Sequence, residues 1–433
     1  MNDILLFLTF ITVLTSTFLG MQYLVYSMYR AWVRNAFNLQ NQKKLITAVH
    51  VFLAFGNSLF FARFFIAFSD WHELAWIQNF IVKPGGIFFA IIFLLFLCSV
   101  VFHFGRILKS IYRKYAIRKK RNLSNYISAQ EKVTLPLSTA EETQQTRREF
   151  LRQAGTVVFT APLILTTGLS IATHRNYQIV QKTLLYPQLP SGLEGLKIAH
   201  ISDIHSGIFM NRNQIAEIFE LINNQHPNLV MITGDLVDTH PSEIPAIQDT
   251  IDLLKSDYGV FTCPGNHDHY ASIEGLTQAL ESTKANFLKN DAKNLIINGE
   301  PFSVLGIDDA GLGNRDFSDL GKALSKSTNE SFKLLLSHRP DMFDKAINHG
   351  IDLTLSGHTH GGQIGFEFAG VELYPIDLFQ KYSRGHYQYG DKQLYVNVGV
   401  GLVGAPIRLV RPEITIFTLT SNPKKVMHKI IDA

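Results

Sequence analysis

Cysteine is scarce in this sequence, with two in 433 residues. Cys98 lies in a long apolar run and Cys263 comes just before Gly265-Asn266-His267, so we expect no disulfide between them. Two cysteines are also too few for a zinc site built from thiolates. The cysteine count thus excludes a cysteine-based metal centre and leaves the redox compartment undetermined.

The sequence also has no strong excess of charge of either sign. It contains 40 Lys and Arg and 36 Asp and Glu, which gives a net charge of +4 at pH 7. This balance gives no basis for nucleic-acid binding, and we expect no nucleic-acid partner. The sequence has no internal repeat and no long low-complexity tract. Its one strong local bias is residues 106–121, with eight Lys or Arg and no Asp or Glu.

Apolar residues are abundant, at 46% of the chain with 32 Phe, and they concentrate in the first 175 residues. Four runs have roughly the 17–25 residues that cross a bilayer: residues 4–28, 45–68, 87–104 and 154–173. They predict an all-α bundle of about four transmembrane helices, three in residues 1–108 and a fourth, anchoring one in residues 153–175. Arg63, inside the second run, either marks function, or extends its charge to the membrane surface, or faces neighbouring helices.

Basic residues orient these spans, because cytoplasmic loops are enriched in Lys and Arg. They lie at Arg30, Arg34, Lys43 and Lys44 and throughout residues 106–152, whereas residues 69–86 set Lys83 against Asp70 and Glu73. Both basic segments are assigned to the cytoplasm, including a basic and polar linker at residues 109–152. We therefore predict a multi-pass protein of the cell membrane whose residues beyond about 174 lie on the outer, periplasmic or extracytoplasmic, side.

The linker ends in Thr146-Arg147-Arg148-Glu149-Phe150-Leu151. Paired arginines before Phe-Leu and a weakly apolar stretch resemble a twin-arginine export signal, which would make the export machinery a partner. The alternative is the basic flank of an ordinary membrane helix. No convincing cleavage site follows, so both interpretations predict an uncleaved anchor that sends the downstream part outward.

From residue 176 onward, short β-rich runs alternate with helical stretches, which is typical of layered α/β proteins. The predicted strands are residues 196–201, 229–233, 259–263, 301–306, 332–337, 353–356, 394–398 and 414–419. The predicted helices are residues 212–224, 243–255, 273–282 and 341–348. Several strands are continuously apolar, as expected when both faces of a sheet are covered.

Residues with metal-binding side chains follow five of these strands. They are Asp203 and His205, then Asp235, Asn266, His338, and finally His358 and His360 within Gly357-His358-Thr359-His360-Gly361-Gly362. A carboxylate has two oxygens, so one Asp can bridge two cations. Carboxylate, amide oxygen and imidazole together suit Mn, Fe, Zn or Co. The pattern predicts a site for two divalent metal ions at the strand ends.

Two neighbouring cations lower the pKa of a water between them and bind phosphoryl oxygens, so the predicted chemistry is hydrolysis of a phosphoester. The leaving group then needs a proton. His267, next to Asn266, is the candidate donor, and Asp268 is expected to fix its tautomer by accepting a hydrogen bond from the other ring nitrogen.

These motifs resemble the calcineurin-like metallophosphoesterase superfamily over roughly residues 178–433: Asp-x-His, Gly-Asp, Gly-Asn-His-Asp, His and Gly-His-x-His. The resemblance implies a four-layer α/β sandwich, two mixed sheets flanked by helices, in a domain we place at residues 176–433. It implies that one metal binds Asp203, His205, Asp235 and His360. The other would bind Asp235, Asn266, His338 and His358, with His267 as acid or transition-state stabiliser.

Further motifs, such as Gly361-Gly362-Gln363, are similar to a membrane-attached bacterial branch of that superfamily. Some of its members cleave the pyrophosphate of a UDP-linked diacylglucosamine, which makes a lipid-linked or nucleotide-type phosphoester a candidate substrate. Such a UDP-sugar is cytoplasmic, in conflict with an outer domain. The alternative is a non-catalytic membrane sensor or transport-associated protein that uses the domain as a binding module.

A few residues remain open between site and scaffold. His269, Tyr270 and His386 line the pocket or are ordinary polar residues, and Arg408 meets a phosphate or forms a surface salt bridge. Residues 366–382 are rich in Phe, Tyr and Leu, and form either an apolar lip facing a bilayer or lipid substrate, or part of the core. His200 is predicted to be a packed histidine.

Overall fold

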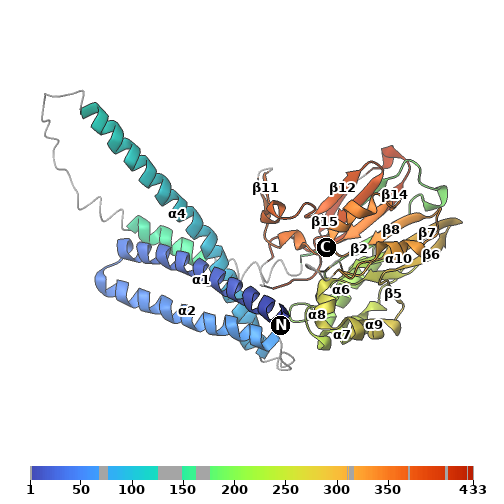
Figure 1. Ribbon diagram of the computed structural model, residues 1–433, viewed down its shortest axis with the longest axis horizontal. Coiled ribbons are helices and arrows are strands. Elements are labelled where there is room, and N and C mark those ends of the chain that lie inside the picture. Colours follow the sequence, from blue (N-terminus) through green and yellow to red (C-terminus); the bar gives the residue numbers. More distant parts are fainter. Residues whose placement is uncertain are drawn as a thin grey trace. The chain divides into compact units, whose positions relative to one another are not determined.

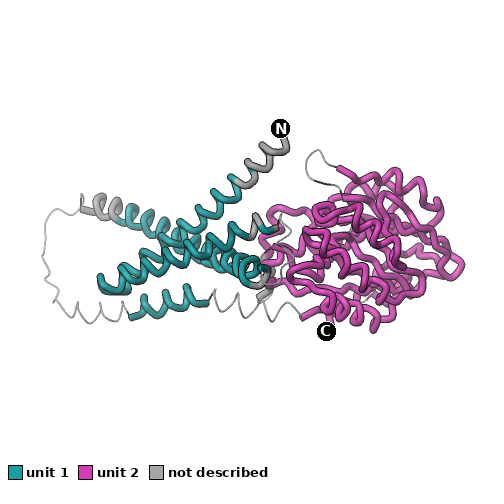
Figure 2. Tube along the Cα trace, turned by 90° about the horizontal axis from the view of Figure 1, so that it is seen from below, with its two compact units in different colours: residues 1–68, 75–167 teal, residues 69–74, 168–433 magenta. Residues whose placement is uncertain are grey.

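A computed structural model describes residues 2–67, 77–124, 149–161, 176–309, 311, 316–368, 371–404, 408–426 and 428–432. The chain separates into two compact units, residues 1–68 with 75–167 and residues 69–74 with 168–433 (Figure 2). The first unit is helical and the second is built around β-sheets (Figure 1).

The helical unit contains α1 (Asn2–Ala36), α2 (Leu39–Ala67), the π-helix η2 (Gln78–Val82) and α4 (Lys83–Ser124). Residues 149–161 are also helical. Phenylalanine rings from three helices meet inside the unit: the centroid of Phe18 lies 4.2 Å from that of Phe60 and 6.2 Å from that of Phe88. Gln22 and Asn57 exchange two side-chain hydrogen bonds of 2.6 and 3.2 Å between α1 and α2. A reciprocal pair of this kind satisfies polar groups where water is excluded.

Among the described residues, two helices are long and apolar enough to cross a membrane, Leu39–Ala62 and Phe80–Ala116. The predicted bundle of about four spans is therefore not confirmed. Helix α1 contains the first apolar run, residues 4–28. Most of the fourth run, residues 162–173, lies outside the described residues, as do Arg147 and Arg148 of the twin-arginine-like segment.

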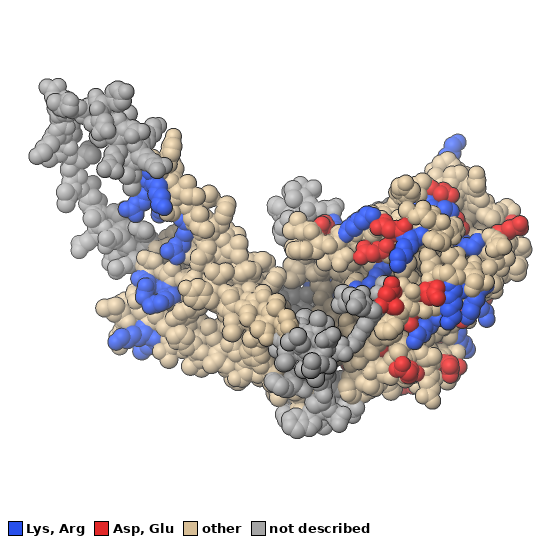
Figure 3. Space-filling view, in the orientation of Figure 1, with Lys and Arg blue, Asp and Glu red and all other residues tan. Residues whose placement is uncertain are grey.

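Apart from Lys83 at the start of α4, the described charged side chains of the helical unit gather toward one end. On the face drawn in Figure 3, the described charges of this unit are all Lys or Arg, and the rest of its described surface is uncharged. The basic residues of the α1–α2 connection and of the second half of α4 supply this end: Arg30, Arg34, Lys43, Lys44, Arg106, Lys109, Arg113 and Lys114.

Two mixed sheets form the second unit (Figure 1). The first has the order β15 (His428–Asp432), β1 (Gln178–Leu185), β14 (Glu413–Thr420), β2 (Lys197–Ile201), β3 (Leu229–Thr233), β4 (Val260–Cys263) and β5 (Ala285–Phe287). The second has the order β12 (Gly385–Tyr389), β13 (Lys392–Val396), β9 (Leu353–Ser356), β8 (Phe332–Leu336), β7 (Glu300–Gly306) and β6 (Asp291–Ile297). A separate hairpin joins β10 (Phe366–Phe368) to β11 (Val371–Leu373).

Helices cover the outer face of each sheet. On the first sheet lie α6 (Arg212–Asn223), α7 (Ile244–Ile251) and α9 (Ile273–Glu281), whose apolar faces share one core with β2 and β3. On the second lie α10 (Leu320–Ser325) and α11 (Phe343–Ala346). A third core, which includes Met231, Phe302 and Phe417, fills the space between the sheets. The result is the expected arrangement of two mixed sheets flanked by helices.

The parallel strands bring the candidate residues to one edge. In the first sheet β2, β3 and β4 run parallel side by side, and in the second β8 and β9 do so. The carboxyl ends of parallel neighbours meet at the same edge of a sheet, which is where ligands bind in α/β folds. At this edge, two of the strands are followed by short helical segments: α8 (Asn266–Ala271) follows β4, and the 3-10 turn η6 (His360–Gly362) follows β9.

Candidate metal centre

The loops after these strands adopt an unusual backbone conformation. Asp203, His205, Asp235, His358 and His360 all have positive φ, between 47° and 71°. Residues other than glycine seldom adopt this backbone region, and such strained conformations are concentrated at functional sites. Five of the seven predicted ligands are therefore held in a conformation that local sequence preference does not favour.

Close packing of these loops depends on glycine. A Cβ at Gly357 would lie 1.8 Å from Ser202 Oγ and 2.2 Å from Asp203 Oδ2. Only a residue without a side chain lets the loop of His358 approach the loop of Asp203 so closely. The backbone amide of His358 then donates to Asp203 Oδ2 at 3.0 Å, which links the two loops directly.

One group of donor atoms comes from Asp203, His205 and His360. Asp203 Oδ1 lies 3.3 Å from His360 Nε2, and the two Nε2 atoms of His205 and His360 face each other at 3.0 Å. All three side chains are buried. Three potential ligand atoms thus converge on one point away from water.

A second group gathers around His338. Its Nε2 lies 3.1 Å from Asp235 Oδ2, 3.2 Å from Asn266 Oδ1 and 3.2 Å from His358 Nδ1. Asp235 Oδ2 also lies 3.6 Å from His205 Nε2 of the first group. The carboxylate of Asp235 therefore stands between the two groups, and the structure brings together all seven residues that the sequence singled out as ligands.

The donor atoms fit divalent cations. Facing imidazole nitrogens at 3.0–3.2 Å compete for one proton, and a cation between them would satisfy both lone pairs. His338 Nδ1 contacts the Thr233 carbonyl oxygen at 2.8 Å, so Nδ1 donates there and Nε2 is the ring nitrogen that faces the group. Among the residues that the structure describes, the buried Nδ1 of His360 has no hydrogen-bond partner. Oxygen and imidazole donors of this kind suit borderline to hard metals.

The protonation preferences agree with this fit. Burial lowers the pKa of His360 to about 3, with His205 adding to the effect, and burial together with His338 lowers the pKa of His358 to about 4. Both imidazoles are therefore neutral at ordinary pH. Burial opposes protonation of His338, but the carboxylate of Asp235 outweighs it and raises its pKa to about 9. A proton there supplies the positive charge that a bound cation would bring, so metal binding is expected to release it.

His267 lies at the exposed side of this centre. Its backbone amide donates to Asp235 Oδ1 at 2.8 Å, and its Nδ1 contacts the Asp238 carbonyl oxygen at 2.5 Å and Asp238 Oδ1 at 3.3 Å. Burial disfavours its charged form, but Asp235 and Asp238 outweigh burial and raise the pKa of His267. The ring is thus held through its Nδ1 beside the two donor groups.

The predicted role of Asp268 is wrong. Its Oδ2 accepts from the Gly265 amide at 2.8 Å, and its Oδ1 accepts from the amides of Leu236 and Val237 at 2.8 and 3.2 Å. Asp268 stands in the first turn of α8, where an acidic side chain reaches back to the helix start. It therefore ties α8 to the loop after β3 and does not contact the ring of His267.

Asp238, which the sequence analysis missed, takes the orienting position. Its Oδ1 lies 3.3 Å from both His205 Nδ1 and His267 Nδ1. Its loop is fixed by buried Glu243, whose Oε2 accepts from three successive amides, those of Asp238, Thr239 and His240, at 2.8–3.1 Å. Its position three residues after Asp235 was the signal available. Because Asp238, His205 and His267 are so close, these three also form a potential metal-binding group.

Arg339 was missed as well. Its Nε donates to Asp309 Oδ1 at 2.7 Å, and its Nη1 lies 3.0 Å from His358 Nε2. The neighbouring Asp308 contacts His269 Nε2 at 2.7 Å, so His269 is held beside the centre without belonging to either donor group. Two buried acids therefore place an arginine and a histidine next to the site, a charge distribution that suits an anionic substrate.

Arg408 neither meets a phosphate nor forms a surface salt bridge, the two roles predicted for it. It is fully buried, and its guanidinium donates to the backbone carbonyls of Val398, Gly399, Gly401 and Val410. The loop that it holds donates in turn from Gly401 N to the Asp203 carbonyl oxygen at 2.8 Å. His200 is buried and contacts Thr233 Oγ1 at 2.9 Å, which confirms it as a packed histidine.

Two buried donor groups with the Asp235 carboxylate between them, at the strand ends of a two-sheet sandwich, fit a metal-dependent phosphoesterase. The chain belongs to the calcineurin-like phosphoesterase family, whose model matches residues 196–362. Domains of this family bind two divalent metal ions, and the protein is accordingly an enzyme rather than a binding module alone.

Named relatives agree. The chain is 32% identical over 289 residues to a Bacillus subtilis protein called uncharacterized metallophosphoesterase YkuE, covering 64% of this chain and 99% of that protein. It is 34% identical over 221 residues to an uncharacterized metallophosphoesterase of Helicobacter pylori, covering 50% of this chain and 57% of that protein. It thus spans little more than half of the latter.

A Danio rerio protein called transmembrane protein with metallophosphoesterase domain is 30% identical over 254 residues, covering 55% of this chain and 56% of that protein. Together with the two candidate spans, this relative indicates membrane association. Among solved structures, a dimetal phosphatase from Danio rerio covers 48% of this chain and 88% of its own, with 11% identity and a TM-score of 0.31.

Proposed function

We propose that this protein is a membrane-bound hydrolase with two metal ions that cleaves a phosphoester or pyrophosphate bond. Asp203, His205 and His360 would hold one cation, and Asn266, His338 and His358 the other, with Asp235 bridging both. The observation that carries the proposal is the position of Asp235 Oδ2, 3.1 Å from His338 Nε2 and 3.6 Å from His205 Nε2. When bound, the two cations supply a water of lowered pKa as nucleophile and neutralise phosphoryl charge.

The chain's own contribution is to hold and deliver a proton. His267 stands at the exposed side, and Asp238 holds its Nδ1, which leaves Nε2 as the ring nitrogen that can serve a substrate. We infer that Nε2 carries the proton given to the leaving oxygen, which prevents expulsion of a high-energy alkoxide. The carboxylates of Asp235 and Asp238, which raise the pKa of His267, keep that proton in place until the bond breaks.

Removing the metal should therefore remove activity. We expect the full-length chain, purified in detergent, to hydrolyse an aryl phosphodiester with Mn²⁺, to lose at least about 10³-fold of its activity when stripped by a chelator, and to recover on addition of Mn²⁺. Metal analysis of the active protein should find two ions per chain. Full activity in protein stripped of metal would disprove the proposal.

We also propose that the catalytic unit lies on the outer side of the cell membrane. Support comes from the basic end of the helical unit, which the positive-inside rule assigns to the cytoplasm, and from the chain order α1, α2, α4 and residues 154–173. An outer domain favours a lipid-linked phosphoester over a cytoplasmic nucleotide-sugar. Arg147 and Arg148 would act in export through the twin-arginine machinery.

The side of the membrane can be measured directly. Protease added to intact spheroplasts should degrade residues 176–433 while leaving a cytoplasmic marker protein whole. If the unit resists protease until the membrane is opened by detergent, the domain is cytoplasmic and the proposed orientation is wrong.

A further inference from the structure

The most exposed large hydrophobic side chains of the described chain are neighbours, Leu378 at 82% and Phe379 at 81% exposure. They project from the end of the 3-10 turn η7 (Pro375–Leu378). An aliphatic and an aromatic side chain together in water carry a free-energy cost that burial in another phase would remove. Residues 366–382 were expected to form either a core segment or an apolar lip, and these two side chains show that its tip is outside the core.

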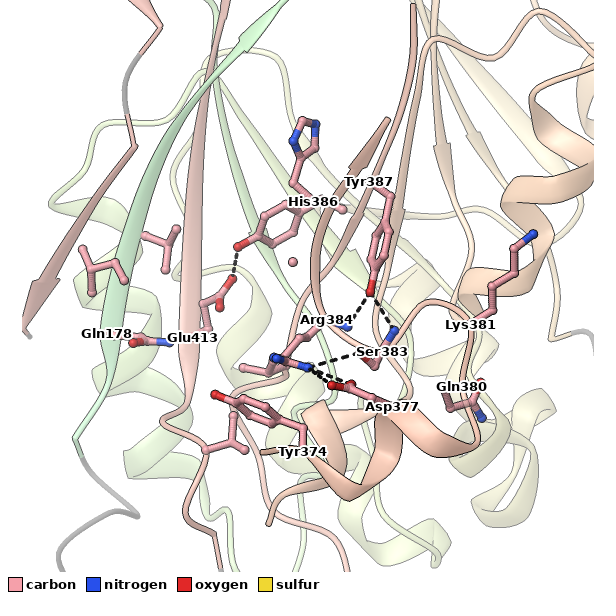
Figure 4. A pocket seen from close by; sticks show the side chains of 16 residues that line it. Gln178, Tyr374, Asp377, Gln380, Lys381, Ser383, Arg384, His386, Tyr387 and Glu413 are labelled. Atoms are coloured by element: carbon pink, nitrogen blue, oxygen red, sulfur yellow. Dashed lines mark hydrogen bonds and ion pairs between the residues drawn. The ribbon is translucent and has the colours of Figure 1, made fainter. Parts of the chain in front are cut away.

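Hydrogen bonds and an ion pair hold this tip in place. The amides of Phe379 and Gln380 both donate to the Ile376 carbonyl oxygen at 2.9 Å. Asp377 pairs with Arg384 Nη1 at 2.8 Å, and the Arg384 guanidinium lies 3.3 Å from the ring centre of Tyr374 (Figure 4). The apolar pair is therefore presented by a structured turn.

The same turn packs against the metal-binding segment. A Cβ at Gly362 would lie 2.9 Å from Ile376 Cβ, so Ile376 covers the backbone two residues beyond His360. A surface that contacts Leu378 and Phe379 would consequently lie beside the loop that carries the candidate ligand.

The turn also borders the point where the chain enters this unit. A cavity of about 570 Å³ is lined both by Gln178, the first residue of β1, and by Asp377 and Gln380 of the tip (Figure 4). Arg411 Nη2 donates to Asn176 Oδ1 at 2.8 Å, which fixes the entering chain at this place. The tip and the entry point therefore share one face of the unit.

The entering chain follows directly on the fourth apolar run. That run, residues 154–173, contains no charged residue and ends three residues before Asn176, a separation of at most about 11 Å along an extended chain. If the run lies in the bilayer, Asn176 is held at the membrane surface, and the face that carries Leu378 and Phe379 is held there too.

We propose that Leu378 and Phe379 insert into the interfacial region of the bilayer that anchors the chain. The nearby basic side chains are paired with acids, Lys381 with Asp344 and Arg384 with Asp377. Insertion of Leu378 and Phe379 therefore rests on apolar contact and does not need anionic lipid. Resting on the proposed hydrolase function, this placement identifies the substrate class as a phosphoester carried by a membrane lipid, met by the site at the headgroup level.

Insertion can be measured without catalysis. A spin label at Phe379→Cys in the Cys98→Ser full-length chain, in phosphatidylcholine nanodiscs, should be more accessible to oxygen than to a water-soluble nickel relaxant. The matched control is Leu253→Cys, an exposed leucine after α7, where the nickel reagent should dominate. Equal accessibility profiles at the two positions, or spin–spin broadening that shows a second copy over Phe379, would overturn the proposal.

Catalysis gives the second test. The double variant Leu378→Asp with Phe379→Asp should keep its rate on a water-soluble aryl phosphodiester and lose about tenfold or more on a diacylglycerol-linked aryl phosphodiester in vesicles, because both inserted side chains become charged. Leu253→Asp should affect neither. Equal loss on both substrates would make the tip merely structural. A wild-type chain inactive on both would refute the proposed hydrolase, while the spin-label result would still decide insertion.

Discussion

Replacing Asp235 by asparagine should abolish hydrolysis. Asparagine keeps the shape of the side chain but removes the charge and one of the two acceptor oxygens that stand between His205 and His338. Loss of an outer partner of a metal ligand already costs 10–100-fold, so loss of a bridging ligand is expected to cost at least about 10³-fold in kcat/KM. The bound metal should fall below two ions per chain.

The matched control is Asp249→Asn, the same chemical change at an exposed carboxylate of α7 that pairs with Arg212. It should keep both metals and full activity. Circular dichroism of each variant checks that the fold is intact, since the buried Asp235 also accepts from the amide of His267. An Asp235→Asn protein with wild-type activity and two bound metals would refute the ligand assignment.

Replacing His267 by glutamine should lower kcat by about 10²–10⁴-fold, the usual contribution of a positioned acid. The loss should be larger for an alkyl phosphodiester than for a nitrophenyl one, because a poor leaving group needs the proton more. Since a general acid must be protonated, and Asp235 and Asp238 raise the pKa of His267, wild-type kcat should fall as pH rises through that raised pKa. The variant should lack this alkaline decline.

Metal content separates two roles for His267. As a proton donor it is dispensable for binding, so the glutamine variant should retain two ions per chain. As a member of the group formed with His205 and Asp238, it would lose metal on substitution. His349→Gln, an exposed histidine after α11, is the control and should behave as wild type in every assay. A metal-depleted His267→Gln protein would contradict the acid role.

The strands that position the site were predictable because they are buried on both faces. Residues 229–233 and 353–356 were predicted with the bounds that β3 and β9 have, and both strands are buried throughout. Strand β6 was missed because three of the first four residues of Asp291–Ile297 are polar and the strand lies at a half-exposed edge of its sheet. Strands β1, β12 and β15 were missed too; they lie at or next to sheet edges, where apolar runs are weak.

The errors at the site concern side-chain direction. Asp268 follows His267 in sequence, which suggested a partnership, yet its place in the first turn of α8 directs the carboxylate to the amides of Gly265, Leu236 and Val237. Asp238 reaches His267 instead because Glu243 folds its loop back. Arg408, which looked like a surface or phosphate-binding residue, is enclosed by carbonyls of its own loop.

The sequence by itself determined the chemistry of this protein. Seven ligand-type side chains after five apolar runs specify a metal-binding phosphoesterase, because parallel strands must bring their carboxyl ends to a common edge. Only the tertiary structure decided which atoms face each other, which carboxylate orients His267, and that Leu378 and Phe379 lie outside the core beside the metal-binding segment. Those outcomes depend on backbone conformations and contacts between distant segments, which spacing along a chain does not encode.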